Sequence, residues 1–291
     1  GVLICRDPDI PKRERRAELL NGVAQQISFA IQNERLESVK ADQQRVEQEF
    51  HLARQIQETF LPEKLPEIAG YELDVRWQTA RQVGGDFYDI FKLHNGSYGM
   101  VIADVSDKGI AAALYMTVTR TLIRSVALES DSPARTLERV NQLLQLDSRR
   151  GFFVTCFYAV LDPANHRLTY ANAGHLPPFF LNPQYKTASP LQRGGTALGI
   201  YEDSTYEERT LSFQPGFSLV LFTDGVTEAF NKYDAAYGTI RYQKMLQRNT
   251  SLSPGALLDA VEEDLSRFRR GVPLSDDITE LAIKRLPLLA D

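Results

Sequence analysis

The chain has 291 residues, which is enough for one or two domains with hydrophobic cores. Its formal net charge is −5 and no run of Lys and Arg stands out, so we expect no nucleic acid as a partner. The longest apolar stretches, such as residues 217–222, have the length of a strand and fall far short of the ~20 residues that cross a bilayer, so we expect no membrane segment either.

Two further features favour a cytoplasmic protein. No basic and then apolar leader opens the chain. The cysteines Cys5 and Cys156 lack metal-ligand or redox spacing, and each lies in an apolar run where a small buried thiol is the default.

The N-terminal part predicts a strand, a turn and a long helix. Residues 1–5 are an apolar run, and residues 7–11 carry the Asp and Pro of a turn that can lead into a helix. Residues 23–61 contain neither Gly nor Pro, and at ~1.5 Å per residue a helix of this extent would reach about 60 Å. Apolar residues recur at spacings near three and four and indicate a heptad-like seam: Leu36, Val39, Val46, Phe50, Ala53 and Ile56.

This helix has two interpretations. It is either a single helix that lies on the following domain or a parallel coiled coil that joins two copies of the chain. We favour the coiled coil, and therefore a homodimer through the N-terminal helix, because polar residues flank the seam on both sides. Pro62 and Pro66 end the helix.

From residue 71 the pattern changes to short apolar runs separated by Gly, Asn, Asp and Pro. Strands are predicted at residues 71–77, 87–91, 98–104, 152–161, 168–173, 179–181, 206–213, 218–223 and 278–284. Helices are predicted at residues 110–127, 133–146 and 254–268, the last two with Pro near the first position. Runs of strands with separate helices indicate an α+β fold in which two sheets lie between helices.

Four aspartates stand at the ends of predicted strands: Asp86 in VGGDFYD, Asp104 in ADVSDKG, Asp224 in LFTDGV and Asp276 in SDDITEL. Any one Asp beside Gly at a strand end is most often a turn former. Several carboxylates at the strand ends of one sheet system, however, repel each other unless cations neutralise them. Oxygen ligands without a Cys/His cluster favour Mg²⁺ or Mn²⁺ over Zn²⁺.

Residues 52–285 resemble the SpoIIE/RsbU branch of the PPM (PP2C-like) phosphatases. The resemblance rests on six ordered segments: VGGDFYD, ADVSDKGIAAAL, ANAGHLPP, LGI, LFTDGVTEA and SDDITELAI. The segment ARQIQETFLP at residues 53–62 also resembles the helix that enters this domain in the family. The resemblance implies an α-β-β-α layered sandwich with a long N-terminal linker helix and a binuclear metal centre at its edge.

The resemblance also assigns roles to site residues. It implies that Asp104 bridges two divalent ions, Mn²⁺ or Mg²⁺, and that the backbone carbonyl of Val105 joins it. Asp86 would bind one ion, while Asp224 and Asp276 would bind the other.

Further residues are assigned on the same basis. Asp277 is expected to support the ligands or to bind a third metal ion, and Asp89 and Asp107 are expected to be turn or supporting residues. Arg81 stands where relatives keep a phosphate-binding arginine, although an exposed structural role is nearly as plausible. His175 is either a proton donor or, as we favour, a residue that holds a turn through its ring hydrogen bonds.

One departure from the family concerns metal affinity. Eukaryotic PP2C enzymes have an acidic pair where this chain has Gly85 and Asp86. We therefore expect the second metal ion to be held more loosely.

The activity that the resemblance implies is that of a metal-dependent protein serine/threonine phosphatase. A hydroxide bridging the two metal ions would attack the phosphorus in line. The usual substrate in this family is a phosphorylated STAS-type anti-anti-sigma factor, which ties the reaction to bacterial stress or developmental signalling. Two alternatives stay open: a catalytically silent signalling module that acts by partner binding, and a metal-dependent phosphodiesterase for a small nucleotide.

The N-terminal end resembles a different family. The opening strand and residues 19–36, LLNGVAQQISFAIQNERL, are similar to the tail of a GAF sensor domain. We therefore predict residues 1–35 as the C-terminal remnant of a GAF-like domain, residues 36–62 as the coiled-coil linker helix and residues 63–291 as the phosphatase domain.

Overall fold

The computed structural model describes residues 13–147 and 151–287. The chain divides into two compact units, Gly1–Leu52 and Ala53–Asp291. The predicted strand at residues 1–5 and the turn at residues 7–11 lie outside the described residues. The GAF-like origin of this end, and the domain boundaries drawn from it, stay predictions.

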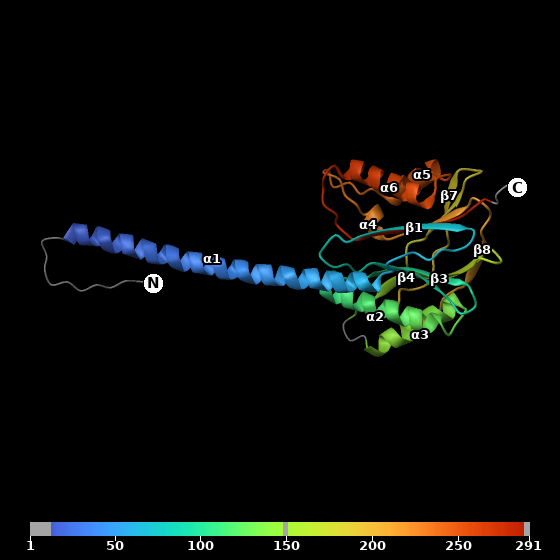
Figure 1. The fold of residues 1–291 in the computed structure, drawn as a ribbon, viewed down its shortest axis with the longest axis horizontal. Helices are drawn as coiled ribbons and strands as arrows, with labels where there is room; N and C mark the ends of the chain where they lie inside the picture. Colours follow the sequence, from blue (N-terminus) through green and yellow to red (C-terminus); the bar gives the residue numbers. More distant parts are fainter. Residues whose placement is uncertain (1–12, 148–150, 288–291) are drawn as a thin grey trace. The chain divides into compact units, whose positions relative to one another are not determined.

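Helix α1 (Arg13–Phe60) forms the described part of the first unit and continues into the second (Figure 1). The predicted long helix is therefore confirmed, although it begins earlier than expected, at Arg13. Gly22 lies inside it, because a single helical Gly costs only about 1 kcal/mol relative to Ala. The seam residues Leu36, Val39 and Val46 are 59%, 53% and 44% exposed in the single chain, and the coiled coil stays a prediction.

Two antiparallel sheets of five strands form the centre of the second unit (Figure 1). The first sheet has the order β1-β10-β9-β6-β7 and the second the order β2-β3-β4-β5-β8. The first sheet contains β1 (Tyr71–Gln78), β10 (Ile278–Arg285), β9 (Ser218–Phe222), β6 (Phe179–Asn182) and β7 (Thr187–Pro190). The second contains β2 (Phe87–Lys92), β3 (Tyr98–Val105), β4 (Val154–Asp162), β5 (Arg167–Ala173) and β8 (Arg209–Ser212).

Helices cover the outer face of each sheet, so the layers run α-β-β-α as predicted (Figure 1). Helices α2 (Ile110–Ala127) and α3 (Pro133–Asp147) pack on the second sheet. Helices α5 (Thr239–Arg248) and α6 (Pro254–Arg269) pack on the first, and the short α4 (Asp224–Thr227) joins them. A third apolar cluster, which includes Ile102, Phe157 and Leu221, fills the space between the sheets.

Three elements were not predicted, and the expectation of only three helices in this domain was wrong. Helix α5 begins after Gly238 and has no side-chain hydrogen bond at its N-cap, so it lacks the usual start signal. Helix α4 has only four residues, Asp224–Thr227. Strand β7 is equally short and ends in Pro190, which a sequence pattern treats as a strand breaker. No helix in the described part of the chain is both long and apolar enough to cross a membrane.

Candidate active site

Strand register brings the four predicted aspartates to one end of the sandwich. Strands β2 and β3 pair so that Asp86, just before β2, lies opposite Asp104 near the end of β3. Strands β9 and β10 pair so that Asp224, two residues after the end of β9, lies near the residues that precede β10. The ends of the two sheets meet here, since hydroxyl groups of Thr223 and Thr279 both donate to Asp86.

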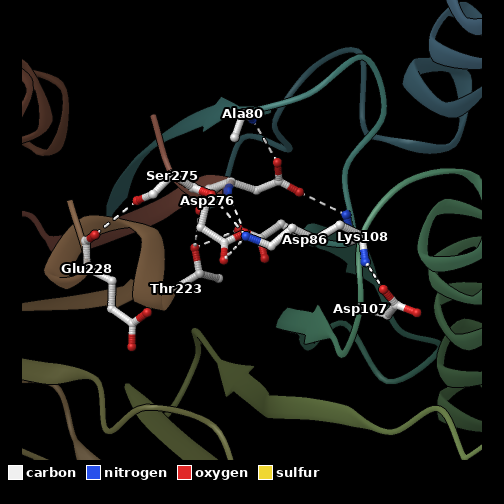
Figure 2. Close-up of polar contacts among 10 residues, drawn as sticks. Ala80, Asp86, Asp107, Lys108, Thr223, Glu228, Ser275 and Asp276 are labelled. Atoms are coloured by element: carbon white, nitrogen blue, oxygen red, sulfur yellow. Dashed lines mark hydrogen bonds and ion pairs between the residues drawn. The ribbon is translucent and has the colours of Figure 1, made fainter. Parts of the chain in front are cut away.

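Asp86 connects the two sheets. It is only 2% exposed, and its Oδ2 accepts a hydrogen bond of 2.6 Å from the hydroxyl of Thr223 (Figure 2). The same oxygen accepts a second hydrogen bond, of 2.8 Å, from the hydroxyl of Thr279 in β10. Burial and the nearby charge of Asp104 raise the pKa of Asp86 well above its ordinary value, although both hydroxyl groups act in the opposite direction.

Asp104 and Asp224 form the more accessible part of the cluster. Burial, followed by the charges of Asp224 and Asp276, raises the pKa of Asp104 to about 7. Burial and the charge of Asp276 raise the pKa of Asp224 to about 6. These carboxyl groups resist ionisation beside one another, and a cation placed among them would relieve the repulsion.

Asp276 already has a cationic partner. Lys108, in the loop between β3 and α2, places its Nζ 2.7 Å from Asp276 Oδ2 and donates a hydrogen bond of 2.9 Å to the carbonyl of Ser275. Asp276 Oδ1 accepts a 2.9 Å hydrogen bond from the backbone N–H of Asp277. Lys108 thus fixes one side of the cluster and partly neutralises it (Figure 2).

Asp277 holds the loop of residues 79–86. Its Oδ1 accepts a hydrogen bond from the backbone N–H of Ala80 and its Oδ2 one from that of Gly85, each of 2.8 Å. A Cβ atom at Gly84 would lie 2.5 Å from Asp277 Oδ2, so the loop packs against this carboxylate only because residue 84 is Gly. Since backbone amides engage both oxygens, we infer a positioning role, and metal binding by Asp277 stays a prediction.

The end of α1 holds the same loop from the other side. Gln57, 3% exposed, donates a hydrogen bond of 2.6 Å from Nε2 to the carbonyl of Gly84. The backbone N–H of Gly84 donates to Gln57 Oε1 at 3.1 Å. Gln57 therefore binds both polar groups of a peptide backbone only two residues before Asp86.

Arg81 and His175 lie in different surroundings. Arg81 is exposed in the loop that leads to Asp86. His175 is buried, with Nδ1 2.9 Å from the hydroxyl of Thr155, and its backbone N–H donates to Asn172 Oδ1 at 2.7 Å. Burial lowers the pKa of His175 to about 4, and its role as a proton donor or as a turn residue stays a prediction.

Asp89 and Asp107 differ from each other. Asp107 has a positive φ of 79° and accepts a hydrogen bond from the backbone N–H of Lys108, as expected of a turn residue. Asp89 instead lies fully buried in β2, where its Oδ2 is 2.8 Å from the guanidinium of Arg120 and 3.7 Å from that of Arg124. This ion pair joins β2 to helix α2.

The donor set fits a hard divalent cation. It consists of carboxylates and the carbonyl of Val105, which lies so close to Gly85 that a Cβ there would be 3.0 Å from its oxygen. Within residues 13–147 and 151–287, however, no three His, Cys, Asp or Glu side chains are already arranged as a metal site. Both hydroxyl groups bind Oδ2 of Asp86 and leave its Oδ1 for a cation. Asp276 is bound through Oδ2 by Lys108, so ligation by that oxygen would require it to exchange partners.

Sequence reasoning missed four residues of this site: Gln57, Lys108, Thr223 and Thr279. Lys108 and Thr223 lie beside the aspartates in the segments ADVSDKGIAAAL and LFTDGVTEA, so their positions were the available signal. Gln57 lies in the segment ARQIQETFLP, but that segment gave no signal of its contact with Gly84, 27 residues further along the chain.

Comparison with known proteins identifies the family of this chain. Residues 94–286 match the family model of Stage II sporulation protein E (SpoIIE). Protein IcfG of Synechocystis is 32% identical over 264 residues, which cover 81% of this chain and 41% of IcfG. Phosphoserine phosphatase RsbU of Bacillus subtilis is 28% identical over 259 residues, which cover 89% of this chain and 76% of RsbU. The chain thus spans about two fifths of IcfG and three quarters of RsbU.

Solved structures show the same fold. The SiaA-PP2C domain of Pseudomonas aeruginosa aligns with a TM-score of 0.75 at 22% identity, covering 84% of this chain and 98% of that domain. The PP2C phosphatase domain of SpoIIE from Bacillus subtilis, with a fragment of its regulatory domain, aligns with a TM-score of 0.63 at 17% identity, covering 74% of this chain and 63% of that one. The chain belongs to the SpoIIE family and carries its PP2C-like phosphatase domain.

Proposed function

We propose that this chain is a metal-dependent phosphatase that removes phosphate from phosphoserine or phosphothreonine of a bacterial signalling protein. The observation that carries the proposal is the convergence of Asp86, Asp104 and Asp224, all with raised pKa values, at one end of the sandwich. The relatives RsbU and RsbP, both of Bacillus subtilis, are named phosphoserine phosphatases.

The cofactor in this proposal is a pair of divalent ions, Mn²⁺ or Mg²⁺. Asp86, Asp104, Asp224, Asp276 and the backbone carbonyl of Val105 would hold the ions. Such ions would lower the pKa of an attacking water and neutralise charge on the phosphoryl oxygens.

The chain's own residues prepare this site in three ways. Thr223 and Thr279 fix the orientation of Asp86, so one of its oxygens is directed by hydrogen bonds before any ion binds. Lys108 holds Asp276 and would also attract an anionic phosphate. Arg81, exposed in the loop before Asp86, could bind two phosphate oxygens through its guanidinium.

The partners are proposed on the same basis. The substrate would be a phosphorylated STAS-type anti-anti-sigma factor in sigma-factor regulation, in the cytoplasm. The exposed seam of α1, which includes Leu36, Val39 and Val46, would join two copies of the chain as a coiled coil. Residues 36–62 would then be a linker through which a preceding sensor acts on the phosphatase domain at residues 63–291.

The test is hydrolysis of p-nitrophenyl phosphate with added Mn²⁺ or Mg²⁺. The wild-type chain should be active with either ion and inactive in EDTA. Asp104→Asn and Asp224→Asn should each reduce turnover to the level of the EDTA sample while the protein stays folded. Asp107→Asn is the matched control, because Asp107 is exposed in the neighbouring turn and Asn also accepts a positive φ. Metal-dependent turnover that survives in Asp104→Asn or Asp224→Asn would refute the assignment.

A further inference from the structure

Helices α5 and α6 enclose a groove that the proposed catalytic chemistry does not use. The groove has a volume of about 920 Å³. Its walls include Ile240, Arg241, Lys244 and Arg248 from α5, and Glu263 and Arg267 from α6.

Some of the positive charges in this groove are paired with acidic side chains of the groove. Asp264, which also lines the groove, accepts a hydrogen bond of 2.6 Å from the hydroxyl of Tyr237 and two longer ones, of 3.2 and 3.3 Å, from Arg241. Arg241 is therefore paired within the groove. Arg267 lies 4.0 Å from Glu263 and 3.9 Å from Asp264, at the limit of an ion pair.

Two cations remain available to a ligand. Lys244 and Arg248 are exposed, and among the residues that the structure describes neither has an ion pair. They follow Ile240, which is 71% exposed, at intervals of four residues, so the three side chains form one ridge along α5. The ridge presents an apolar contact followed by two positive charges, on a chain whose net charge is −5.

The groove is attached to the candidate active site. The backbone N–H of Gly238, which precedes α5 and lines the groove, donates a hydrogen bond of 2.9 Å to the carbonyl of Thr227 at the end of α4. The N–H of Tyr237 donates to the carbonyl of Ala229 at 2.8 Å. Helix α4 begins at Asp224, so this four-residue helix and the two hydrogen bonds connect the proposed metal ligand to the groove.

We propose that the α5–α6 groove binds an acidic segment of the phosphoprotein substrate that is separate from its phosphoserine. Charge complementarity selects the occupant, because Lys244 and Arg248 offer unneutralised positive charge beside an apolar residue. When the groove holds a phosphoprotein, the phosphoserine of that protein has a higher effective concentration at the carboxylate cluster than a free small ester has. This inference rests on the proposed phosphatase function.

The experiment compares two synthetic phosphoserine peptides that differ only in carrying Glu or Gln along one flank. The wild-type chain with Mn²⁺ should show a lower KM for the Glu peptide at equal kcat, and added salt should reduce the difference. The double variant Lys244→Glu, Arg248→Glu should raise the KM for the Glu peptide about tenfold or more and leave the Gln peptide unaffected. Arg248 also complements the negative end of α5, so Lys244→Glu alone should reproduce the effect with the helix end intact.

The control is Arg135→Glu, Arg139→Glu, which reverses a pair of exposed charges with the same spacing on α3, a helix of the opposite layer. An equal loss in this control, or an unchanged KM in the groove variant, would overturn the docking surface. Tighter binding of a single-stranded oligonucleotide than of the Glu peptide would overturn a protein as the occupant. Failure of the wild-type chain to hydrolyse p-nitrophenyl phosphate would instead contradict the proposed function, which separates the two ideas.

Discussion

The contact between Gln57 and Gly84 offers a sharp test of how the site is supported. The substitution Gln57→Leu keeps the size of the side chain and removes both hydrogen bonds to Gly84. The loop of residues 79–86 would still be held by Asp277, so we expect the domain to fold.

The magnitude follows from the two lost hydrogen bonds. Each contributes about 0.5–1.5 kcal/mol net, so the free energy of unfolding should fall by about 1–3 kcal/mol. The upper half of that range is expected, because Gln57 is 3% exposed and leaves the N–H and carbonyl of Gly84 without these partners. For a domain of this size, a loss of about 2 kcal/mol lowers the melting temperature by about 4–8 °C.

The loop also carries Asp86, so the same change should affect cation binding. If the full loss of about 2 kcal/mol falls on the conformation of the loop that binds the cation, the apparent affinity for Mn²⁺ decreases by up to about thirtyfold. The assays are thermal unfolding in EDTA and the Mn²⁺ concentration that gives half-maximal hydrolysis of p-nitrophenyl phosphate. Gln55→Leu, an identical change at an exposed position of the same helix, is the control. Equal melting temperatures and equal half-activating Mn²⁺ in the two variants would refute the reasoning.

Three further predictions concern charge, substrate and assembly. In the folded chain the pKa of Asp104 is about 7 and that of Asp224 about 6, above the ~3.9 of an Asp in the unfolded chain. Between these values the folded chain binds more protons than the unfolded chain, so proton binding by these two groups stabilises the fold at low pH. This stabilisation should be lost as the pH rises from about 4 to 7. The melting temperature in EDTA should therefore fall more steeply over this range in wild type than in Asp104→Asn, Asp224→Asn, and parallel curves would contradict the sign. Arg81→Ala should raise KM for a phosphoprotein without changing half-activating Mn²⁺, whereas unchanged kinetics would return Arg81 to a structural role. Val46→Asp plus Phe50→Asp should give monomers with altered metal-dependent activity, and light scattering that still reports a dimer would exclude the coiled coil.

Sequence patterns predicted most of the sandwich because its strands and helices obey local rules. Helix α2 (Ile110–Ala127) was predicted at its observed bounds, since it starts after Gly109 and repeats apolar residues at helical spacing. The aspartates at strand ends were predicted for the same reason: a strand that ends in Asp and Gly can be recognised without knowing its neighbours. Helix α5 was missed because it has few apolar residues and no capping side chain, and it is stabilised by burial of residues such as Tyr242 and Leu246.

The support of the site was beyond the reach of local patterns. Gln57 in the sequence is one more polar residue of a long helix, and only the fold brings it to Gly84. Asp277 was expected near the metal ions, but the amides of Ala80 and Gly85 that occupy its oxygens lie almost two hundred residues earlier, at separations of 197 and 192. Hydrogen bonds between such distant residues depend on the packing of both sheets, which no window along the chain contains.

The two hydrogen bonds that Asp86 accepts affect whether its presence in a related sequence indicates an active enzyme. Its Oδ2 is bound by Thr223 and Thr279, both fully buried, and so links the start of β2 to the opposite sheet. In a descendant that lost its catalysis this link would still join the two sheets, so selection for folding alone would favour Asp86 with its two threonines. Asp104 and Asp224 have no comparable hydroxyl partners among the described contacts. Their loss would therefore identify an inactive descendant more reliably than the presence of Asp86 would identify an active one.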